Sequence, residues 1–133
     1  MQWVPEFDAR EALEAAVGRR VLGASSNLTF LAIELDDGHG LLAEARLDDA
    51  AARVAVVRLP VASLPTLEEA VCSVDWSWIV GSVVRAATLA AGQLRLELAP
   101  AGPLTVSAAL WQGAPFLAFQ PYRAPNRAPS SAQ

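Results

Sequence analysis

The sequence of 133 residues contains no lysine, one cysteine and one histidine. Without lysine, the chain cannot form a Schiff base through its own side chains or supply the lysine of a phosphate-binding P-loop. A single cysteine cannot make an internal disulfide, and the apolar residues around Cys72 predict a small buried side chain rather than a reactive thiol. Several common catalytic groups are therefore excluded.

Clustered positive charge and long apolar runs are missing as well. The net charge is -4, and the only adjacent basic residues are Arg19 and Arg20, which argues against a nucleic acid as partner because phosphate binding needs clustered positive charge. No run approaches the roughly 18 to 20 apolar residues of a membrane span. Met1 to Gly18 contains four acidic residues, unlike a secretory signal. We therefore expect a cytoplasmic protein with no membrane partner.

The sequence does contain an internal match. Val17 to Val57 aligns without a gap on Val80 to Gln120, at a constant offset of 63 residues. The identical positions, given by their numbers in the first copy, are Val17, Gly18, Val21, Ala24, Leu31, Glu34, Leu35, Leu41, Ala45, Leu47, Ala51 and Ala55. Two copies of one unit usually pack around a pseudo-twofold axis into one core. We predict a single domain over residues 1–122, made of repeats at about 5–59 and 64–122.

Each repeat is predicted to open with a helix. Asp8 to Glu11 has the spacing of a capping box, and the apolar stripe that follows it stops at Gly18. Thr66 to Glu69 repeats the capping signal, and apolar residues at helical spacing then continue to Trp78, with the end of the helix near Gly81. The pattern indicates one helix before each set of strands, and the second helix is the longer one.

After each helix the apolar residues recur at every second position, which is the period of a half-buried strand. The predicted strands are Arg19–Ser25, Leu31–Leu35, Leu41–Leu47, Arg53–Arg58, Ser82–Leu89, Leu94–Leu98, Leu104–Leu110 and Pro115–Gln120. Asp36 to His39 and Ala99 to Gly102 carry the residues of tight hairpin turns. The fold class is therefore α+β: two α-β-β-β(-β) units that form an antiparallel sheet sandwich or half-open barrel with two helices.

Proline and small polar residues mark two segments outside this pattern. Pro60 to Pro65 lies between the repeats and is predicted to link them. Arg123 to Gln133 contains proline among small and polar residues and lacks an apolar period. We expect residues 123–133 to be a flexible, proline-rich tail.

The two repeats differ most in charge. Val17 to Arg58 contains eleven charged residues, whereas Val80 to Pro121 contains three: Arg85, Arg95 and Glu97. The outer face of the second repeat's sheet therefore has little that prefers water, and such a surface is normally covered. The pattern leaves three coverings open: the longer second helix, a second copy of the chain, or a distinct partner protein or small ligand.

Four aromatic residues are candidate binding residues: Trp76, Trp78, Trp111 and Tyr122. On a helix, Trp78 continues the apolar stripe toward the core, which predicts that Trp76 is exposed. Trp111 stands where the first repeat has Asp48. Exposed tryptophan and tyrosine are typical of binding hot spots. The alternative is that these rings pack over the edge of the sheet or under the C-terminal tail.

Glu34 and Glu97 occupy equivalent positions and are the candidate catalytic pair. If they face each other across the pseudo-axis, two nearby carboxylates can act as acid and base. The alternative is that each is a solvated strand residue paired with an arginine, such as Arg46 in the first repeat. His39 shares its turn with two aspartates, but this spacing matches no metal motif. We predict neither a metal nor another cofactor.

These features favour a non-enzymatic binding or protein-interaction module that forms a homodimer through its charge-poor second repeat. A second hypothesis is a small hydrolase or isomerase that uses Glu34 and Glu97 in a cleft between the repeats. A third is a purely structural subunit of a larger assembly. The internal match and the loss of charge in the second repeat carry the first hypothesis, whereas the second depends on the two carboxylates meeting.

Overall fold

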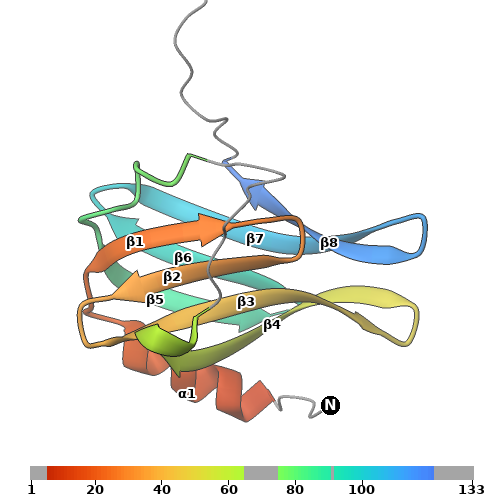
Figure 1. Cartoon of the computed structure of the whole chain (residues 1–133), viewed down its shortest axis with the longest axis horizontal. Coiled ribbons are helices and arrows are strands. Elements are labelled where there is room, and N and C mark those ends of the chain that lie inside the picture. The colour runs from red at the N-terminus through yellow and green to blue at the C-terminus, as the bar shows by residue number, and fades with distance from the viewer. Residues whose placement is uncertain (1–5, 65–74, 91, 122–133) are drawn as a thin grey trace, which may run out of the picture.

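A computed structural model describes residues 6–64, 75–90 and 92–121 of the chain. In this part, an α-helix precedes two antiparallel four-stranded sheets, β1–β4 and β5–β8, each with its strands in chain order (Figure 1). The elements are α1 (Glu6–Ala16), β1 (Val21–Ser26), β2 (Phe30–Leu35), β3 (His39–Asp48), β4 (Ala51–Pro60), a 3-10 helix η1 (Val61–Ser63), β5 (Val83–Ala90), β6 (Gln93–Ala99), β7 (Gly102–Trp111) and β8 (Ala114–Gln120). Every predicted strand is present, with ends that differ by at most two residues.

Helix α1 forms because small and apolar residues recur on one of its faces. Ala9, Ala12, Leu13 and Ala16 are buried, at the spacing of one helical stripe. The helix begins at Glu6, so Asp8 lies inside it and the predicted capping start at Asp8 is wrong. The buried face of α1 packs on β4 and β5, which places the helix along one open side of the two sheets.

The second predicted helix falls largely on residues 65–74, which lie outside the described part of the chain. Its expected end is described: Asp75 and Trp76 have no regular structure, and Ser77 to Gly81 forms turns rather than helix. The Asp75 carboxylate accepts hydrogen bonds from the Ser77 N–H at 3.0 Å and from the Ser77 hydroxyl at 2.6 Å. This local bonding competes with helical bonding, so the prediction of a helix through Trp78 to Gly81 is wrong.

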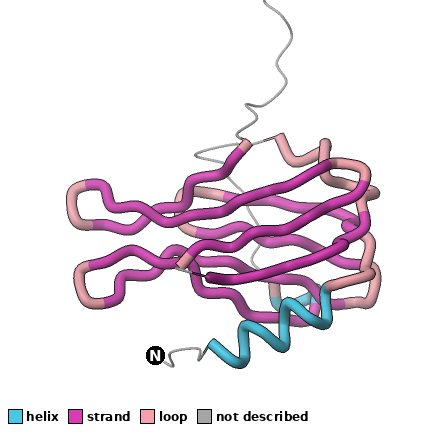
Figure 2. The backbone as a smooth tube through the Cα atoms, turned by 180° about the vertical axis from the view of Figure 1, so that it is seen from behind, coloured by secondary structure: helices cyan, strands magenta, loops and turns pink. Residues whose placement is uncertain are grey.

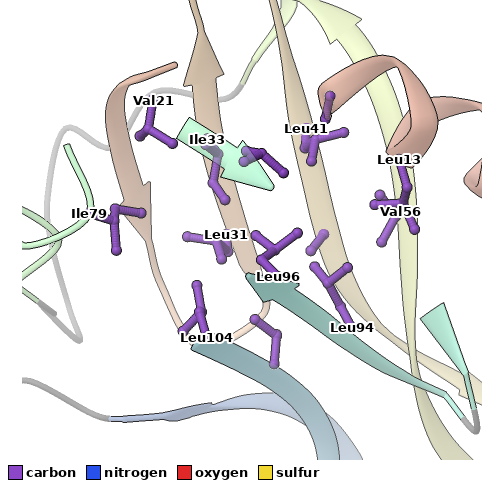
Figure 3. Close-up of a cluster of buried hydrophobic side chains, with 14 of the residues drawn as sticks. Leu13, Val21, Leu31, Ile33, Leu41, Val56, Ile79, Leu94, Leu96 and Leu104 are labelled. Carbon is purple, nitrogen blue, oxygen red and sulfur yellow. The ribbon is translucent and has the colours of Figure 1, made fainter. Parts of the chain in front are cut away.

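The two sheets pack face to face as a sandwich, and the inward side chains of both meet in one core (Figure 3). Strand alternation selects these side chains: β2 contributes Leu31, Ile33 and Leu35, and β6 contributes Leu94, Leu96 and Leu98, all of which are buried. Further core residues come from the other elements: Leu13, Val21, Leu41, Val54, Val56, Ile79, Val84, Leu104, Val106 and Leu117. Of the two predicted architectures, the sandwich is therefore the one formed.

Strand pairing in the second sheet repeats that of the first at the offset of 63. Leu31 pairs with Ala43 in the first sheet, and Leu94 pairs with Val106 in the second. The register shift in β1 follows Val21, and the shift in β5 follows the equivalent Val84. The two sheets thus share strand order, register and the place of their bulge.

The sheets are joined where β1 and β5 begin. Gly18 donates its N–H to the Val84 carbonyl at 2.7 Å, and the equivalent Gly81 donates to the Val21 carbonyl at 2.8 Å. Both glycines have φ of +90°, a conformation that residues with a Cβ rarely adopt. Between these two hydrogen bonds, Arg20 and Val83 form an antiparallel β-bridge. Equivalent residues of the two halves therefore form reciprocal hydrogen bonds across this junction.

Single backbone bonds also connect the sheets at their far corners. The Val54 N–H in β4 donates to the Gly92 carbonyl in the β5–β6 turn at 3.0 Å. The Leu117 N–H in β8 donates to the Leu28 carbonyl in the β1–β2 turn at 2.8 Å. Each outer strand thus contacts the hairpin turn of the opposite sheet, which holds the sandwich closed at both sides.

The hairpins β3–β4 and β7–β8 extend past the rest of the sandwich at one end (Figures 1 and 2). Asp49 and Ala50 form the tip of the first with φ of 53° and 66°, and Gln112 and Gly113 form the tip of the second with φ of 52° and 81°. Two successive residues with positive φ are the conformation of a type I′ turn, which matches the twist of a hairpin. Ala50 therefore holds a conformation that favours glycine.

The outer face of the first sheet is partly covered by the chain that follows β4. Leu42 points away from the core but is buried. Leu64, just after η1, lies over the neighbouring Gly40, where an added Cβ would come within 2.7 Å of its Cδ1 and would also collide with the Ile33 carbonyl oxygen. Gly40 is thus required for the close approach of Leu64 to the sheet.

Candidate interaction surface

The hairpin β7–β8 presents a surface without charge on the side away from the core. Leu104, Val106 and Leu117 are buried, so the alternating residues between them point outward. We call these outward side chains the neutral face. Its residues are Thr105, Ser107, Ala109, Trp111, Ala114, Phe116, Ala118 and Gln120. Ser107 pairs with Ala118 and Ala109 with Phe116, so the surface is continuous across both strands.

The equivalent face of the first sheet is charged. At the offset of 63, Ser107, Ala109 and Trp111 correspond to Glu44, Arg46 and Asp48. Arg46 pairs with Glu44 at 2.6 Å, and Asp48 pairs with Arg53 at 3.3 Å. Most of the difference in charge seen in the sequence therefore lies on the two long hairpins.

The second sheet carries a charged pair at the border of the neutral face, where Arg95 of β6 pairs with Thr105 of β7. Arg95 and Glu97 are neighbours on the outer side of β6, and Arg95 Nε lies 2.8 Å from Glu97 Oε2. Figure 2 shows the molecule from the side of this sheet, and among the described residues no helix crosses its outer face. The part of the chain that the structure describes therefore leaves the neutral face uncovered.

Trp111 is the most exposed large apolar residue among those described. Its exposed fraction is 68%, compared with 53% for Leu47 and 42% for Leu110. All three lie near the tips of the projecting hairpins, and Leu110 is the equivalent of Leu47. Apolar side chains on a projecting tip are accessible to a partner without any rearrangement of the sheet.

The two neighbouring tryptophans are arranged differently from the prediction. Trp76 was expected to be exposed, but its exposed fraction is 4%, and its Nε1–H donates to Ser26 Oγ at 2.9 Å. Its ring meets Phe119 edge-on with centroids 5.0 Å apart and stacks on Trp78 at 6.4 Å. Trp78 is partly buried against the core. The prediction for Trp76 is wrong because these residues form turns, in which helical spacing does not decide which side chain faces inward.

Trp76 therefore belongs to the core and not to an accessible aromatic cluster. It closes the side of the sandwich between β1, which carries Ser26, and β8, which carries Phe119. Within the described residues, no ring contact links it to Trp111. Tyr122, the fourth candidate, lies outside the described residues. Of the four predicted binding aromatics, Trp111 is the one that the structure places on an open surface.

The structure does not bring the two candidate carboxylates together. Glu34 lies between the buried Ile33 and Leu35 in β2, so it points to the outer side of the first sheet. Glu97 lies in β6 on the outer side of the second sheet, in its ion pair with Arg95. The core separates the two side chains. They share no cleft in which one could act as acid and the other as base.

Asp37 is the centre of a small charged cluster at the β2–β3 turn. Its carboxylate, 10% exposed, accepts a hydrogen bond from Arg58 Nη2 at 2.8 Å, lies 3.7 Å from Arg19 Nε, and accepts the His39 N–H at 3.1 Å. Burial acts to raise the pKa of Asp37, but the hydrogen bonds and the two positive charges outweigh it and lower the pKa below its ordinary value. The cluster ties the turn to β4 and to the chain after α1.

No metal centre or membrane span is found in the described residues. In residues 6–64, 75–90 and 92–121, no three histidine, cysteine, aspartate or glutamate side chains gather closely enough to hold an ion. His39 instead lies beside its turn, with Nδ1 3.4 Å from the Asp37 carbonyl oxygen. None of the described helices is long and apolar enough to cross a membrane. Cys72 lies outside the described residues.

Comparison of the chain with protein-family models, curated proteins and solved structures gave no significant match. The neutral face is thus the feature of the molecule that indicates a function. One of its residues, Phe116, was not singled out from the sequence. The run from Phe116 to Phe119 contains two aromatic residues and one leucine, and only the pairing with β7 decides that Phe119 points inward and Phe116 outward.

Proposed function

We propose that this protein is a non-enzymatic interaction module whose neutral face binds a second copy of the chain. The observation that carries the proposal is the 68% exposure of Trp111 at the end of a charge-free, two-stranded surface. Tryptophan is enriched at the centre of interfaces, and charged residues are depleted there. A face without charge can also meet its own copy around a twofold axis without placing like charges opposite each other.

The size of the neutral face suggests a reversible dimer. Seven residues of strand span about 23 Å and two strands about 10 Å, so the flat area is a few hundred Å². A standard stable interface buries about 800 Å² on each partner. The neutral face alone is smaller than this. We expect self-association in the micromolar range or weaker, unless neighbouring parts of the sheet also contribute.

We further propose that the two halves are copies of one duplicated unit. The shared register, the shared bulge and the reciprocal bonds of Gly18 and Gly81 support this origin. In a duplicated unit, both outer faces start with the same residues. The difference between Glu44, Arg46 and Asp48 in the first half and Ser107, Ala109 and Trp111 in the second then arose after the duplication, and it leaves one outer face suited to water and the other to a partner.

The proposal is tested by the molar mass in solution, measured by light scattering after size-exclusion chromatography from about 1 μM to about 1 mM protein. The parent chain is expected to move from monomer to dimer within this range. Trp111→Ser should weaken the dimer by about tenfold or more, because it removes the largest side chain of the face. Leu22→Ser is the matched control, since Leu22 is 50% exposed on β1 of the other sheet.

The outcomes separate the hypotheses clearly. A dimer that weakens in Trp111→Ser and persists in Leu22→Ser supports the proposed face. A parent chain that stays monomeric throughout, or a dimer that both variants weaken equally, contradicts it. Circular dichroism of both variants provides the control for folding, since both replaced side chains are exposed and neither change should alter the sheet content.

A further inference from the structure

A second candidate site lies on the other side of the molecule, between α1 and β5. A pocket of about 280 Å³ opens there. Its lining residues are Arg10, Leu13 and Glu14 from the helix and Ala87, Thr88 and Leu89 from the strand. Leu13 is buried at its base, whereas Arg10 and Glu14 are exposed at its rim. The pocket therefore has an apolar base at Leu13 and one positive and one negative charge at its mouth.

The strand that lines the pocket has a free edge. β5 is the outermost strand of its sheet; apart from the bridge between its first residue, Val83, and Arg20, it pairs with β6. In an antiparallel pair, residues alternate between bonding to the neighbouring strand and pointing away from it. Val84 points away, since it donates its N–H to the Arg19 carbonyl at 2.9 Å. The bulge adds one residue, Arg85. After it, the residues whose backbone N–H and carbonyl groups point away from β6 are Ala87 and Leu89.

The equivalent hairpin of the first sheet supports this assignment of the outward-bonding residues in β5. The Asn27 N–H donates to the Phe30 carbonyl at 3.0 Å, closing the β1–β2 hairpin. The equivalent pair in the second sheet is Ala90 with Gln93. Ala90 therefore bonds inward, and Leu89 carries its N–H and carbonyl outward. Among the described residues, no backbone group outside β6 forms a hydrogen bond with Ala87 or Leu89.

The pseudo-equivalent site on the opposite side shows what such a recess accommodates. At the offset of 63, Leu13 in α1 takes the place of Trp76, which lies just before a turn, and Leu89 takes the place of Ser26. There the indole fills the space beside β1 and donates to Ser26 Oγ. A leucine in place of an indole leaves part of the equivalent volume empty. The pocket beside β5 is thus the counterpart of a site that the protein fills with an aromatic ring.

We propose that the groove between α1 and β5 binds an extended peptide of a partner protein. The peptide pairs with the free edge at Ala87 and Leu89 and inserts one aromatic or large aliphatic side chain over Leu13. Addition of a strand at a sheet edge supplies affinity through backbone bonds, and a pocket for an alternate side chain supplies selectivity. This inference is independent of the proposed dimer, because no residue of the neutral face lines the groove.

The strand edge beside the pocket favours a peptide over a free small molecule. A recess of about 280 Å³ lies at the lower end of the range of ligand pockets, about 300 to 1,000 Å³, and has room for one large side chain. The free backbone groups of Ala87 and Leu89 are spaced for a strand and not for a compact ligand. Glu14 and Arg10 at the rim can each pair with an opposite charge on the peptide beside its anchoring residue.

The test is selection of a random library of twelve-residue displayed peptides against the full chain, followed by affinity measurements with the enriched peptides. The selected peptides should share one aromatic or large aliphatic residue within a segment of high strand propensity. Addition of such a peptide should slow hydrogen exchange at the amides of Ala87 and Leu89 and leave the amide of Thr88, which bonds within the sheet, unchanged.

Two variants separate the pocket from the strand edge. Leu13→Trp should fill the recess as Trp76 fills its counterpart, and Ala87→Pro removes an outward N–H at an edge position where proline is tolerated. Each should weaken binding of the selected peptides by about tenfold or more. Trp111→Ser leaves the groove intact and should bind the same peptides with unchanged affinity.

Either of two results would overturn the inference. One is a selection that yields no peptide binding at micromolar affinity. The other is a set of selected peptides that binds Leu13→Trp and Ala87→Pro as tightly as it binds the parent. If Leu13→Trp fails to fold, Ala87→Pro together with the exchange of the Leu89 amide decides the question, because both report on the strand edge alone.

Discussion

Replacing Trp76 by alanine is expected to lower the free energy of unfolding by about 3 to 5 kcal/mol, whereas the same replacement at Trp111 should change it by less than about 0.5 kcal/mol. The two residues are chemically identical and differ only in their surroundings. Trp76 is 4% exposed and Trp111 is 68% exposed. The pair therefore tests directly whether Trp76 belongs to the core.

Three contributions make up the expected loss at Trp76. Burial of an aromatic side chain of about 150 to 250 Å² stabilises the fold by roughly 4 to 6 kcal/mol as an upper bound, since the unfolded chain already buries part of this area. The hydrogen bond to Ser26 Oγ contributes about 1 kcal/mol. The edge-on contact with Phe119 contributes about 0.5 to 1.5 kcal/mol. Relaxation around the cavity reduces the observed total.

The assay is urea unfolding followed by far-ultraviolet circular dichroism, which does not depend on the tryptophan that is removed. A total stability of about 5 to 15 kcal/mol is usual for a domain, so Trp76→Ala can leave the chain unfolded. Trp76→Leu, which copies the equivalent Leu13, is then the measurable variant, with an expected loss of about 2 to 3 kcal/mol. Equal losses at Trp76 and Trp111, or no loss at Trp76, would refute the placement of the indole in the core.

Three further predictions concern the turns and the first sheet. Asp37→Asn should lower the free energy of unfolding at neutral pH, because the pKa of Asp37 is depressed in the folded state. The difference from the parent should persist above about pH 4 and disappear as the pH falls through the folded pKa. Urea unfolding midpoints measured across this pH range test the prediction. Ala50→Gly should raise the free energy of unfolding by about 0.5 to 1 kcal/mol, because its φ is 66°, while Ala51→Gly, in an extended strand, should lower it by a similar amount. Gly40→Ala should lower the free energy of unfolding by about 2 kcal/mol or more, because its Cβ would meet a backbone oxygen that cannot move aside. Gly23→Ala should leave it nearly unchanged, because the added Cβ would have only a flexible side-chain oxygen 3.7 Å away. Thermal unfolding of both variants tests the difference.

The strands could be predicted because their signal is local. Leu31, Ile33 and Leu35 alternate with residues that tolerate water, and this period of two identifies a half-buried strand without knowledge of its neighbours. The first residue of the helix was harder to predict. Asp8 carries a capping pattern, yet the helix begins at Glu6, since a side-chain pattern by itself does not fix the first residue of a helix.

The candidate site divides in the same way. Trp111 could be recognised because it replaces an aspartate in an otherwise matching strand, and a difference between two copies is visible in the sequence alone. Trp76 could not be placed correctly. Its prediction assumed a continuous helix, and the hydrogen bonds between Asp75 and Ser77 form a turn instead, so the side chain that helical spacing puts outside packs inside.

By itself, the sequence determined which segments become strands, that the two halves share one pattern, and that the second half has little charge on its outer side. These follow from periodicity, turn residues and composition, which act over a few neighbouring residues. Only the tertiary structure decided that Glu34 and Glu97 lie on opposite sides of the core, that Phe116 joins Trp111 on one face, and that a groove remains beside Leu13. Each of these depends on strand register and on how the two sheets pack, and both are set by contacts between residues distant along the chain.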